Sequence, residues 1–432
     1  MHSFRYVGKN LFCEGVSVEA LAKKFGTPLY VYSQHTLEDH FQKLDAALAP
    51  LDHLVCFAMK ANSNLSVMRT LANLGSGFDV VSAGELQRVI AAGGDPKKCV
   101  FAGVAKSAAE IEFALRQGIY SFNCESEPEI LRINQVAARL KKRAPIAVRI
   151  NPNVAAKTHS KITTGTYENK FGIQFEHVEA VYARASKLEN IRLRGVQMHI
   201  GSQLTDVTPY ELAVKKVLPL IRKLAEKYEL EFFSPGGGLG IIYNPALASG
   251  AAAWWKSSAA KGVLTPASYA EKLLPLLQPL GLKILVEPGR FIVGNAGALV
   301  TQVEYVKRTG KKNFVIVDAA MNDLIRPAFY DSYHEIVPLK KKPGAPIISD
   351  VVGGICESSD CFCKNRPLAK VGEGDQLALL SAGAYGFVMA SNYNTRPLAA
   401  EVLVSGKHFA LARERQTVKA IWAGEKIVSW LK

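Results

Sequence analysis

Three residues whose side chains could take part in catalysis lie at the ends of apolar, strand-like runs of the sequence. Lys60 ends "VCFAMK", His199 ends "VQMH" and Glu287 ends "KILVE". Burial disfavours the charged form of a lysine by up to ~3–5 pKa units, and a neutral amine can condense with a carbonyl to form a Schiff base. The pattern therefore indicates Lys60 as a candidate nucleophile. The alternative is a lysine that only extends from the end of a strand into solvent.

A glycine-rich turn supplies a second requirement of Schiff-base chemistry with a phosphorylated aldehyde. Residues 234–240 read "SPGGGLG", which permits close backbone approach and can turn several N–H groups toward an anion. Glu287 in "VEPGR" is either a plain ion-pair partner of its neighbour Arg290 or the carboxylate that a pyridine nitrogen needs. With His199 to cover the ring face, these residues predict a site for pyridoxal phosphate.

Eight short apolar runs must position these groups. They fall at 54–59, 77–82, 99–103, 120–125, 146–152, 195–202, 230–237 and 283–289. The segments between them place apolar residues at three- and four-residue steps and often end in glycine, which is typical of helices. The alternation predicts a (β/α)8 barrel, in which active-site residues gather at the C-terminal ends of the strands.

After residue 295 the pattern changes to β-rich runs separated by turn residues, which predicts a second, all-β domain of sandwich or barrel type. We expect an N-terminal segment, 1–34, to join this domain, the barrel to occupy 35–290, and the β domain to occupy 291–432. Residues 244–262 are rich in Ala, Ser and Gly. They are expected to form a long surface loop, with a lid near the site as the alternative.

Composition excludes several other classes of protein. The 432 residues contain no apolar run of ~18 or more, and the N-terminus lacks an apolar signal region, so we expect a cytoplasmic protein. The seven cysteines have no regular spacing, which argues against a disulfide framework. The formal net charge of +15 is spread along the chain without a nucleic-acid-binding motif. It suits an anionic small ligand better.

Many ordered motifs together carry a resemblance to a known family. They include "FAMKANSN", "GFDVVSAGEL", "VRINPNVAAKTHSKITTG", "MHIGSQ", "GGGLGI", "EPGR", "MNDLIRPAFY", "GGICESSD" and "GAYGFVMASNYN". In this order, and over nearly the whole chain, the sequence resembles the diaminopimelate decarboxylases. These are pyridoxal-phosphate enzymes of the alanine-racemase-like, fold-type III group. The resemblance implies decarboxylation of meso-2,6-diaminopimelate to L-lysine and CO2, the last step of lysine biosynthesis.

The resemblance assigns roles toward the cofactor. Lys60 would carry pyridoxal phosphate, His199 would lie against the ring face, and Glu287 would contact the pyridine nitrogen. A carboxylate there keeps the nitrogen protonated, so that the ring accepts electrons when CO2 leaves. The groups expected to hold the phosphate are Ser202, the backbone around Gly238, the Gly289–Arg290 segment and Tyr385.

The resemblance also points to residues that bind substrate and return a proton. Arg326 and Tyr330, with Arg290 and Tyr385, are candidates for holding the distal end through its carboxylate, and Glu357 is a candidate partner of the distal ammonium. Structural ion pairing is the alternative for Arg326 and Glu357. Cys356 would donate the proton after decarboxylation. The "CESSD" stretch would come from a neighbouring subunit, which implies a homodimer with shared sites.

Several other functions are possible for a chain of this kind, and each has a sequence feature against it. Decarboxylases of ornithine, arginine or carboxynorspermidine tend to have an aspartate after the cysteine, where this chain has Glu357. A racemase usually has an arginine, not Glu287, at the pyridine nitrogen. A non-catalytic pyridoxal-phosphate-binding protein is expected to have lost Cys356, Arg326 or Glu357. A structural zinc site at Cys356, Cys361 and Cys363 lacks a histidine or a second cysteine pair, so no metal is expected.

Overall fold

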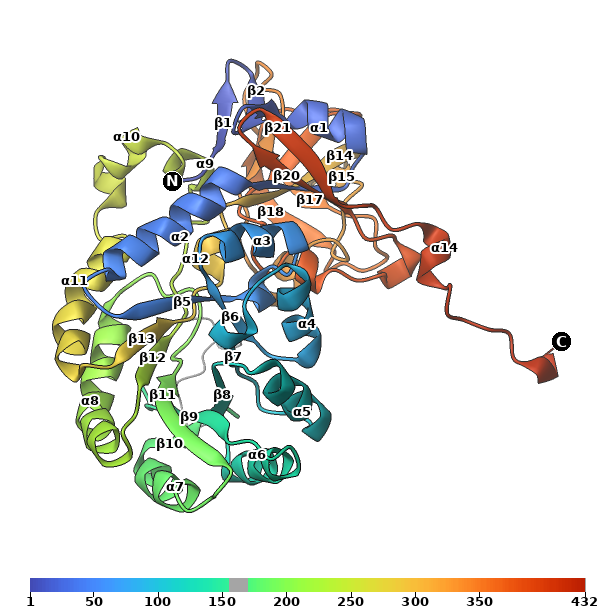
Figure 1. Cartoon of the computed structure of the whole chain (residues 1–432). Coiled ribbons are helices and arrows are strands. Elements are labelled where there is room, and N and C mark those ends of the chain that lie inside the picture. The colour runs from blue at the N-terminus through green and yellow to red at the C-terminus, as the bar shows by residue number, and fades with distance from the viewer. Residues whose placement is uncertain (155–169, 432) are drawn as a thin grey trace. The chain divides into compact units, whose positions relative to one another are not determined.

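The computed structural model describes residues 1–154 and 170–431 (Figure 1). The chain forms two compact units. One comprises Met1–Thr36, Ile242–Lys256 and Val293–Lys432, and the other Leu37–Ile241 and Ser257–Ile292. Residues 155–165 of the "VRINPNVAAKTHSKITTG" motif lie outside the described residues.

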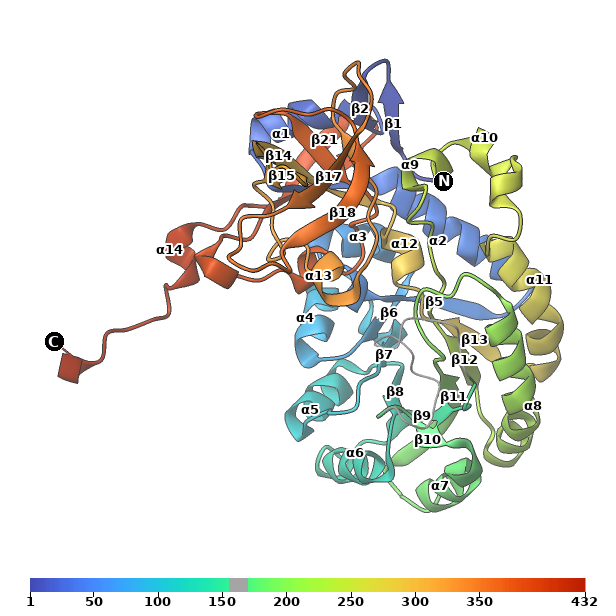
Figure 2. The ribbon, with the colours of Figure 1, turned by 180° about the vertical axis from the view of Figure 1, so that it is seen from behind.

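Eight parallel strands of the second unit form a closed barrel (Figures 1 and 2). Each strand pairs in parallel with its neighbours, and pairing of β8 with β9 and of β13 with β5 closes the ring. A short strand, β10 (Ile173–Gln174), lies beside β9. The barrel strands are β5 (His53–Ala58), β6 (Gly77–Val80), β7 (Cys99–Phe101), β8 (Ser121–Cys124), β9 (Ala144–Asn151), β11 (Ile191–Met198), β12 (Phe232–Gly236) and β13 (Lys283–Val286).

Burial on both faces explains why these strands read as short apolar runs. The lower part of the barrel is filled by a cluster of buried side chains that come from different strands, namely Cys56, Val100, Ala147, Phe232 and Leu285. All eight predicted strands are confirmed.

A helix follows each barrel strand. The helices are α3 (Leu65–Asn73), α4 (Ala83–Ala91), α5 (Ala108–Gln117), α6 (Glu127–Arg139), α7 (Val178–Ala185), α8 (Thr208–Tyr228), α11 (Pro266–Leu277) and the short α12 (Arg290–Val293), and α2 (Gln34–Leu48) precedes β5. Local sequence fixes several ends. Ser107 and Glu110 form a capping box at the start of α5, and Gly118, at φ 70°, ends it.

The first unit is built on a mixed sheet. The N-terminal strand β4 (Leu29–Ser33) lies between β14 (Gly297–Arg308) and β20 (Ala400–Ser405), so the predicted union of the N-terminal segment with the C-terminal sheet is confirmed. The other strands of this sheet are β15 (Asn313–Val317), β16 (Ile336–Pro338), β17 (Ile347–Val352), β18 (Cys361–Leu368), β19 (Gln376–Leu379) and β21 (His408–Arg413).

A small N-terminal sheet and several short helices complete this unit. The strands are β1 (Phe4–Val7), β2 (Asn10–Cys13) and β3 (Val16–Ser17), and the helices are α1 (Val18–Phe25), α9 (Ala246–Ser249), α10 (Ala252–Trp255), α13 (Arg326–Tyr330) and α14 (Val418–Ile421). The segment expected to be a loop, 244–262, thus contains α9 and α10. Its first part, up to Lys256, is anchored in the first unit, because the Ala246 carbonyl lies 2.7 Å from His2 Nε2 and Leu247 N–H donates to Glu335.

Candidate active site

Lys60 lies in the single turn that follows β5, directly after the buried residues Ala58 and Met59. Its Nζ donates to Asp79 Oδ2 at 2.7 Å, and the Asp79 side chain is 1% exposed whereas that of Lys60 is 41% exposed. Asp79 belongs to β6 and is paired in register with Ala58. The amine that follows β5 is therefore bonded to a buried carboxylate, while part of the Lys60 side chain is accessible to solvent.

Glu287 is buried at the end of β13 and is held by side chains of three other strands. Ser234 Oγ and Gln197 Nε2 each donate to its carboxylate at 2.9 Å, and Asn123 Nδ2 lies 3.4 Å from it. The pKa of Glu287 is raised to about 7, chiefly by burial and also by the Asp79 carboxylate, although the Lys60 charge and the two hydrogen bonds act to lower it. A buried carboxylate held by neutral hydrogen-bond donors is stabilised in its charged form by a positively charged partner.

His199 follows β11 and is neutral. Burial lowers its pKa well below the usual value, and the charges of Arg149 and Lys60 act in the same direction. Its Nδ1 accepts a hydrogen bond from Gly237 N–H at 3.3 Å, which puts the ring proton on Nε2. Gly237, which bonds His199, also lies against the backbone of Glu287, and the Lys60 charge acts on both side chains, so these three predicted residues lie at one end of the barrel.

The glycine-rich turn after β12 passes so close to neighbouring backbone that side chains are excluded. A Cβ on Gly237 would lie 1.9 Å from the Glu287 carbonyl oxygen, and a Cβ on Gly238, at φ +109°, would lie 2.2 Å from that of Gly201. Beside the turn, Arg290 NH2 donates to Ser202 Oγ at 3.2 Å. The predicted phosphate residues Ser202 and Arg290 are thus in direct contact.

Sequence reasoning did not assign several polar groups of this barrel end. Asp79, Asn123, Gln197 and Ser234 hold Lys60 and Glu287, as described above. A further buried ion pair joins Arg149 NH1 to Glu125 Oε1 at 2.7 Å, and Glu125 also accepts from Gly172 N–H. The available signal was one polar residue inside an apolar run, as in "GFDVV", "SFNCE" and "VQMH".

Apart from Arg290, the predicted substrate and proton-transfer residues belong to the first unit. Arg326, at the start of α13, is buried and donates to Tyr243 Oη at 2.5 Å and Ser332 Oγ at 3.1 Å. Tyr330 ends the same helix. Tyr385 is half-buried and has a positive φ of 56°, a strained conformation for a residue with a side chain.

Cys356 and Glu357 lie exposed in the turn before β18. Cys356 is a free thiol, and Glu357 accepts hydrogen bonds from Ser359 Oγ at 3.1 Å and from Tyr393 Oη. Glu357 raises the pKa of the Tyr393 hydroxyl. Cys361 Sγ lies 3.1 Å from the Cys363 carbonyl oxygen. In residues 1–154 and 170–431, no group of three His, Cys, Asp or Glu side chains is placed to hold a metal.

The closed barrel, with a lysine, a buried carboxylate and a glycine-rich turn at its strand ends, indicates the class of protein to which the chain belongs. The family model described as "Pyridoxal-dependent decarboxylase, pyridoxal binding domain" matches residues 34–294. The chain belongs to this family and, within it, to the diaminopimelate decarboxylases. Diaminopimelate decarboxylase of Vibrio cholerae is 49% identical over 97% of each chain, and that of Pseudomonas aeruginosa 48% over 99% of this chain and 100% of the relative.

Solved structures agree with this assignment. The chain is similar to diaminopimelate decarboxylase from Helicobacter pylori complexed with L-lysine, with a TM-score of 0.87 and 40% identity, over 94% of this chain and 98% of that chain. The structure of diaminopimelate decarboxylase from M. jannaschii in co-complex with L-lysine gives a TM-score of 0.91 and 37% identity, over 100% of this chain and 99% of that chain. Among the described residues, no helix is long and apolar enough to cross a membrane.

Proposed function

We propose that this protein catalyses the pyridoxal-phosphate-dependent decarboxylation of meso-2,6-diaminopimelate to L-lysine and CO2, the last step of lysine biosynthesis. One observation carries the proposal. The Lys60 amine and the buried Glu287 carboxylate lie at the same end of one closed barrel, where each acts electrostatically on the other. The kinship with diaminopimelate decarboxylases over nearly the whole chain supports the choice of substrate.

The residues at the barrel end fit the cofactor. Oδ1 of Asp79 and Oε1 of Gln197 are buried and accept no hydrogen bond from the described residues, so the site has unused polar capacity. The glycine turn provides backbone without side chains, which suits a phosphate. When bound, pyridoxal phosphate supplies an electron sink for the bond that breaks. The residues that would hold it are Lys60, His199, Ser202, Gly238, Glu287, Gly289, Arg290 and Tyr385.

Glu287 and His199 would act on the ring from different sides. An ionised Glu287 at the pyridine nitrogen holds a proton there, which increases the electron demand of the ring. His199 is neutral and buried, so it can cover a ring face without adding a charge that opposes the ring nitrogen. Ser234 and Gln197 orient the Glu287 carboxylate for this contact.

Substrate orientation decides which bond breaks, and we assign it to residues of the first unit together with Arg290. Arg326, Tyr330 and Tyr385 would hold the distal end through its carboxylate, since a guanidinium pairs with a carboxylate through two hydrogen bonds. Glu357 would pair with the distal ammonium. Cys356 Sγ would return a proton to the carbon that has lost CO2.

We also propose that the protein is a cytoplasmic homodimer whose two copies share each site, with Cys356 and Glu357 acting in the site of the other copy. This proposal rests on the likeness of "GGICESSD" to the same segment of the family. A two-fold dimer of this kind contains two equal composite sites.

A substrate panel tests the proposed function. Purified protein with pyridoxal phosphate is incubated separately with meso-diaminopimelate, L-ornithine and L-arginine, and CO2 and the amine product are quantified. We expect equal amounts of CO2 and L-lysine from meso-diaminopimelate and rates at least ~100-fold lower with the other two, because they leave Arg326 without its carboxylate partner. Preferred turnover of ornithine or arginine, or racemisation without CO2, would overturn the assignment.

A further inference from the structure

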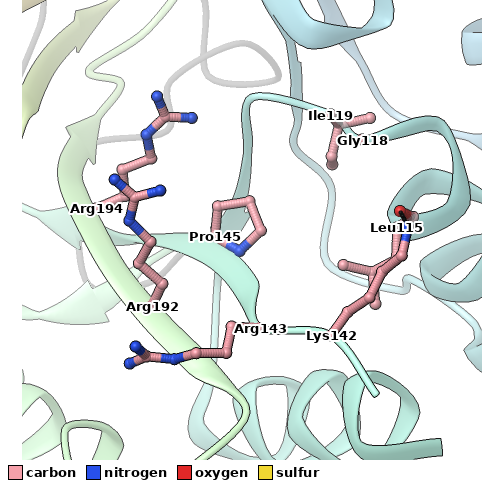
Figure 3. A pocket seen from close by; sticks show the side chains of 8 residues that line it. All are labelled: Leu115, Gly118, Ile119, Lys142, Arg143, Pro145, Arg192 and Arg194. Atoms are coloured by element: carbon pink, nitrogen blue, oxygen red, sulfur yellow. Dashed lines mark hydrogen bonds between the residues drawn. The ribbon is translucent and has the colours of Figure 1, made fainter. Parts of the chain in front are cut away.

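A basic pocket lies at the opposite end of the barrel from Lys60. It is formed at the start of β9 and β11 and by the end of α5, whereas the site described above lies at the C-terminal ends of the strands. Its volume is about 320 Å³. The residues that line it are Leu115, Gly118, Ile119, Lys142, Arg143, Pro145, Arg192 and Arg194 (Figure 3).

The pocket has a cationic side and an apolar side. Figure 3 shows Arg192 and Arg194 on one side, Leu115 and Ile119 on the other, and Pro145 between them. Leu115 and Ile119 are each only 4% exposed, so their side chains are held in place by packing. The pocket therefore offers contact to a small molecule that carries both a negative group and a carbon skeleton.

Two of the cationic side chains, Arg194 and Arg143, are already held by contacts within the protein. Arg194 donates to the Tyr120 carbonyl at 2.6 Å and to Glu231 at 2.8 Å, and its guanidinium lies 3.7 Å from the centre of the Tyr120 ring. Arg143 donates to the Ile191 carbonyl at 2.9 Å. Because these contacts already restrict the side chains, binding an anion costs less conformational entropy than it would at free surface arginines.

The positive charge of the pocket exceeds the negative charge paired with it. Glu231 is shared by Arg192 and Arg194. Lys142 donates to the Leu115 carbonyl and Arg143 to the Ile191 carbonyl, and these backbone groups bear no net charge. Three guanidinium groups and one ammonium thus surround the pocket with a single bonded carboxylate. Each guanidinium has five N–H donors, arranged as a fork that matches the oxygens of a phosphate.

We propose that this pocket is a second ligand site, which binds the phosphate group of a small anion. The phosphate is held by Arg143, Arg192 and Arg194, and any carbon skeleton attached to it packs against Leu115, Ile119 and Pro145. The site is separate from the proposed active site and does not depend on the assigned reaction.

Isothermal titration of the holoenzyme tests this site. Bound pyridoxal phosphate fills the cofactor's own phosphate site, so added anions report on the pocket. Inorganic phosphate and phenyl phosphate are the probes, at an ionic strength of about 0.15 M to screen diffuse surface charge. We expect one site per chain for phenyl phosphate. Tighter binding of phenyl phosphate than of inorganic phosphate identifies an organic phosphate as the ligand, and equal binding identifies free phosphate.

Two variants make the test specific. The double substitution Arg143→Gln with Arg192→Gln should weaken phenyl phosphate binding about tenfold or more and leave decarboxylation unchanged. Arg184→Gln is the control, because Arg184 on α7 is 56% exposed and paired with Glu127, much as Arg192 is 55% exposed and paired with Glu231. The proposal is overturned if the wild-type protein binds neither probe, if the double variant binds normally, or if the control loses as much affinity.

Discussion

At the scale of residues, the barrel end combines groups whose protonation states are set by burial. Glu287 holds a proton more readily than an exposed glutamate, since its pKa is raised to about 7, whereas His199 is held neutral because its pKa is lowered. A protonated pyridine nitrogen would reverse the preference of Glu287, because an opposite charge nearby favours the carboxylate. Cofactor binding and ionisation of Glu287 are therefore expected to be coupled.

The first prediction concerns stability of the cofactor-free protein against pH. The pKa of Glu287 is raised from 4.5 to about 7 on folding. The folded state therefore binds the proton more tightly, and this contribution to stability is complete below pH 4.5 and is lost as pH rises through about 7. The free energy of unfolding of the wild-type protein should fall by on the order of 2–3 kcal/mol more than that of Glu287→Gln between about pH 5 and pH 8.

Urea unfolding of both proteins across this pH range measures the difference. Glu112→Gln, which changes an exposed carboxylate on α5, is the control and should follow the wild-type curve. Parallel curves for the wild-type protein and Glu287→Gln would show that Glu287 is ionised with its ordinary pKa in the folded protein.

At the scale of elements, the sequence predicts the barrel because its strands and helices differ in period. The eight apolar runs are short and buried on both faces, and the helices carry clear ends such as Ser107 and Gly118. The strand β18 is not predicted, because the polar residues Lys364, Asn365 and Arg366 interrupt the apolar residues at its two ends. The helix α13 was missed because five residues are too few to show a helical period.

The site was predictable to the extent that its residues follow a strand. Lys60, His199 and Glu287 stand at strand ends and were found together. The residues that hold them were not assigned, because contacts such as Gln197 with Glu287 join positions 90 residues apart, and only the closed barrel brings them together. The same is true of Arg326 with Tyr243 in the first unit.

The second prediction concerns the turn between β12 and α9. Gly237→Ala would place a Cβ 1.9 Å from the Glu287 carbonyl oxygen, so the turn must move away from the end of β13. We expect pyridoxal phosphate to bind at least about tenfold more weakly, because the turn and Glu287 are then displaced relative to each other. Equilibrium dialysis with the cofactor measures the change.

Gly84→Ala on α4 is the matched control. The nearest atom to a Cβ there is Ser82 Oγ at 3.7 Å, an ordinary contact distance, so cofactor affinity should be unchanged. If Gly237→Ala binds the cofactor as tightly as Gly84→Ala does, the close approach at Gly237 has no part in the cofactor site.

At the scale of the whole molecule, the proposed residues divide between the two units. Lys60, His199 and Glu287 belong to one, whereas Arg326, Cys356 and Glu357 belong to the other. Each unit alone therefore holds part of the proposed machinery. If a second copy supplies Cys356 and Glu357, the dimer is the smallest active form.

The third prediction follows from this division. Lys60→Ala and Cys356→Ala dimers should each be nearly inactive. When they are mixed equally and exchange subunits, half of the dimers are mixed, and each mixed dimer has one intact site and one site with both changes. Roughly a quarter of wild-type activity should return by this symmetry. If native mass spectrometry confirms exchange and no activity returns, Lys60 and Cys356 act within one chain.

The most direct test of the central claim is to locate the cofactor on the chain. Borohydride reduction of the holoenzyme fixes pyridoxal phosphate to the lysine that carries it, and peptide mapping by mass spectrometry identifies that residue. The barrel unit also contains a buried lysine, Lys106, which donates to Glu129 at 2.5 Å and to two backbone carbonyls. We predict that Lys60 is the modified residue, and that CO2 release from meso-diaminopimelate falls in proportion to the fraction of Lys60 that is modified. Modification of Lys106 or another lysine, or turnover that survives complete reduction, would contradict the account.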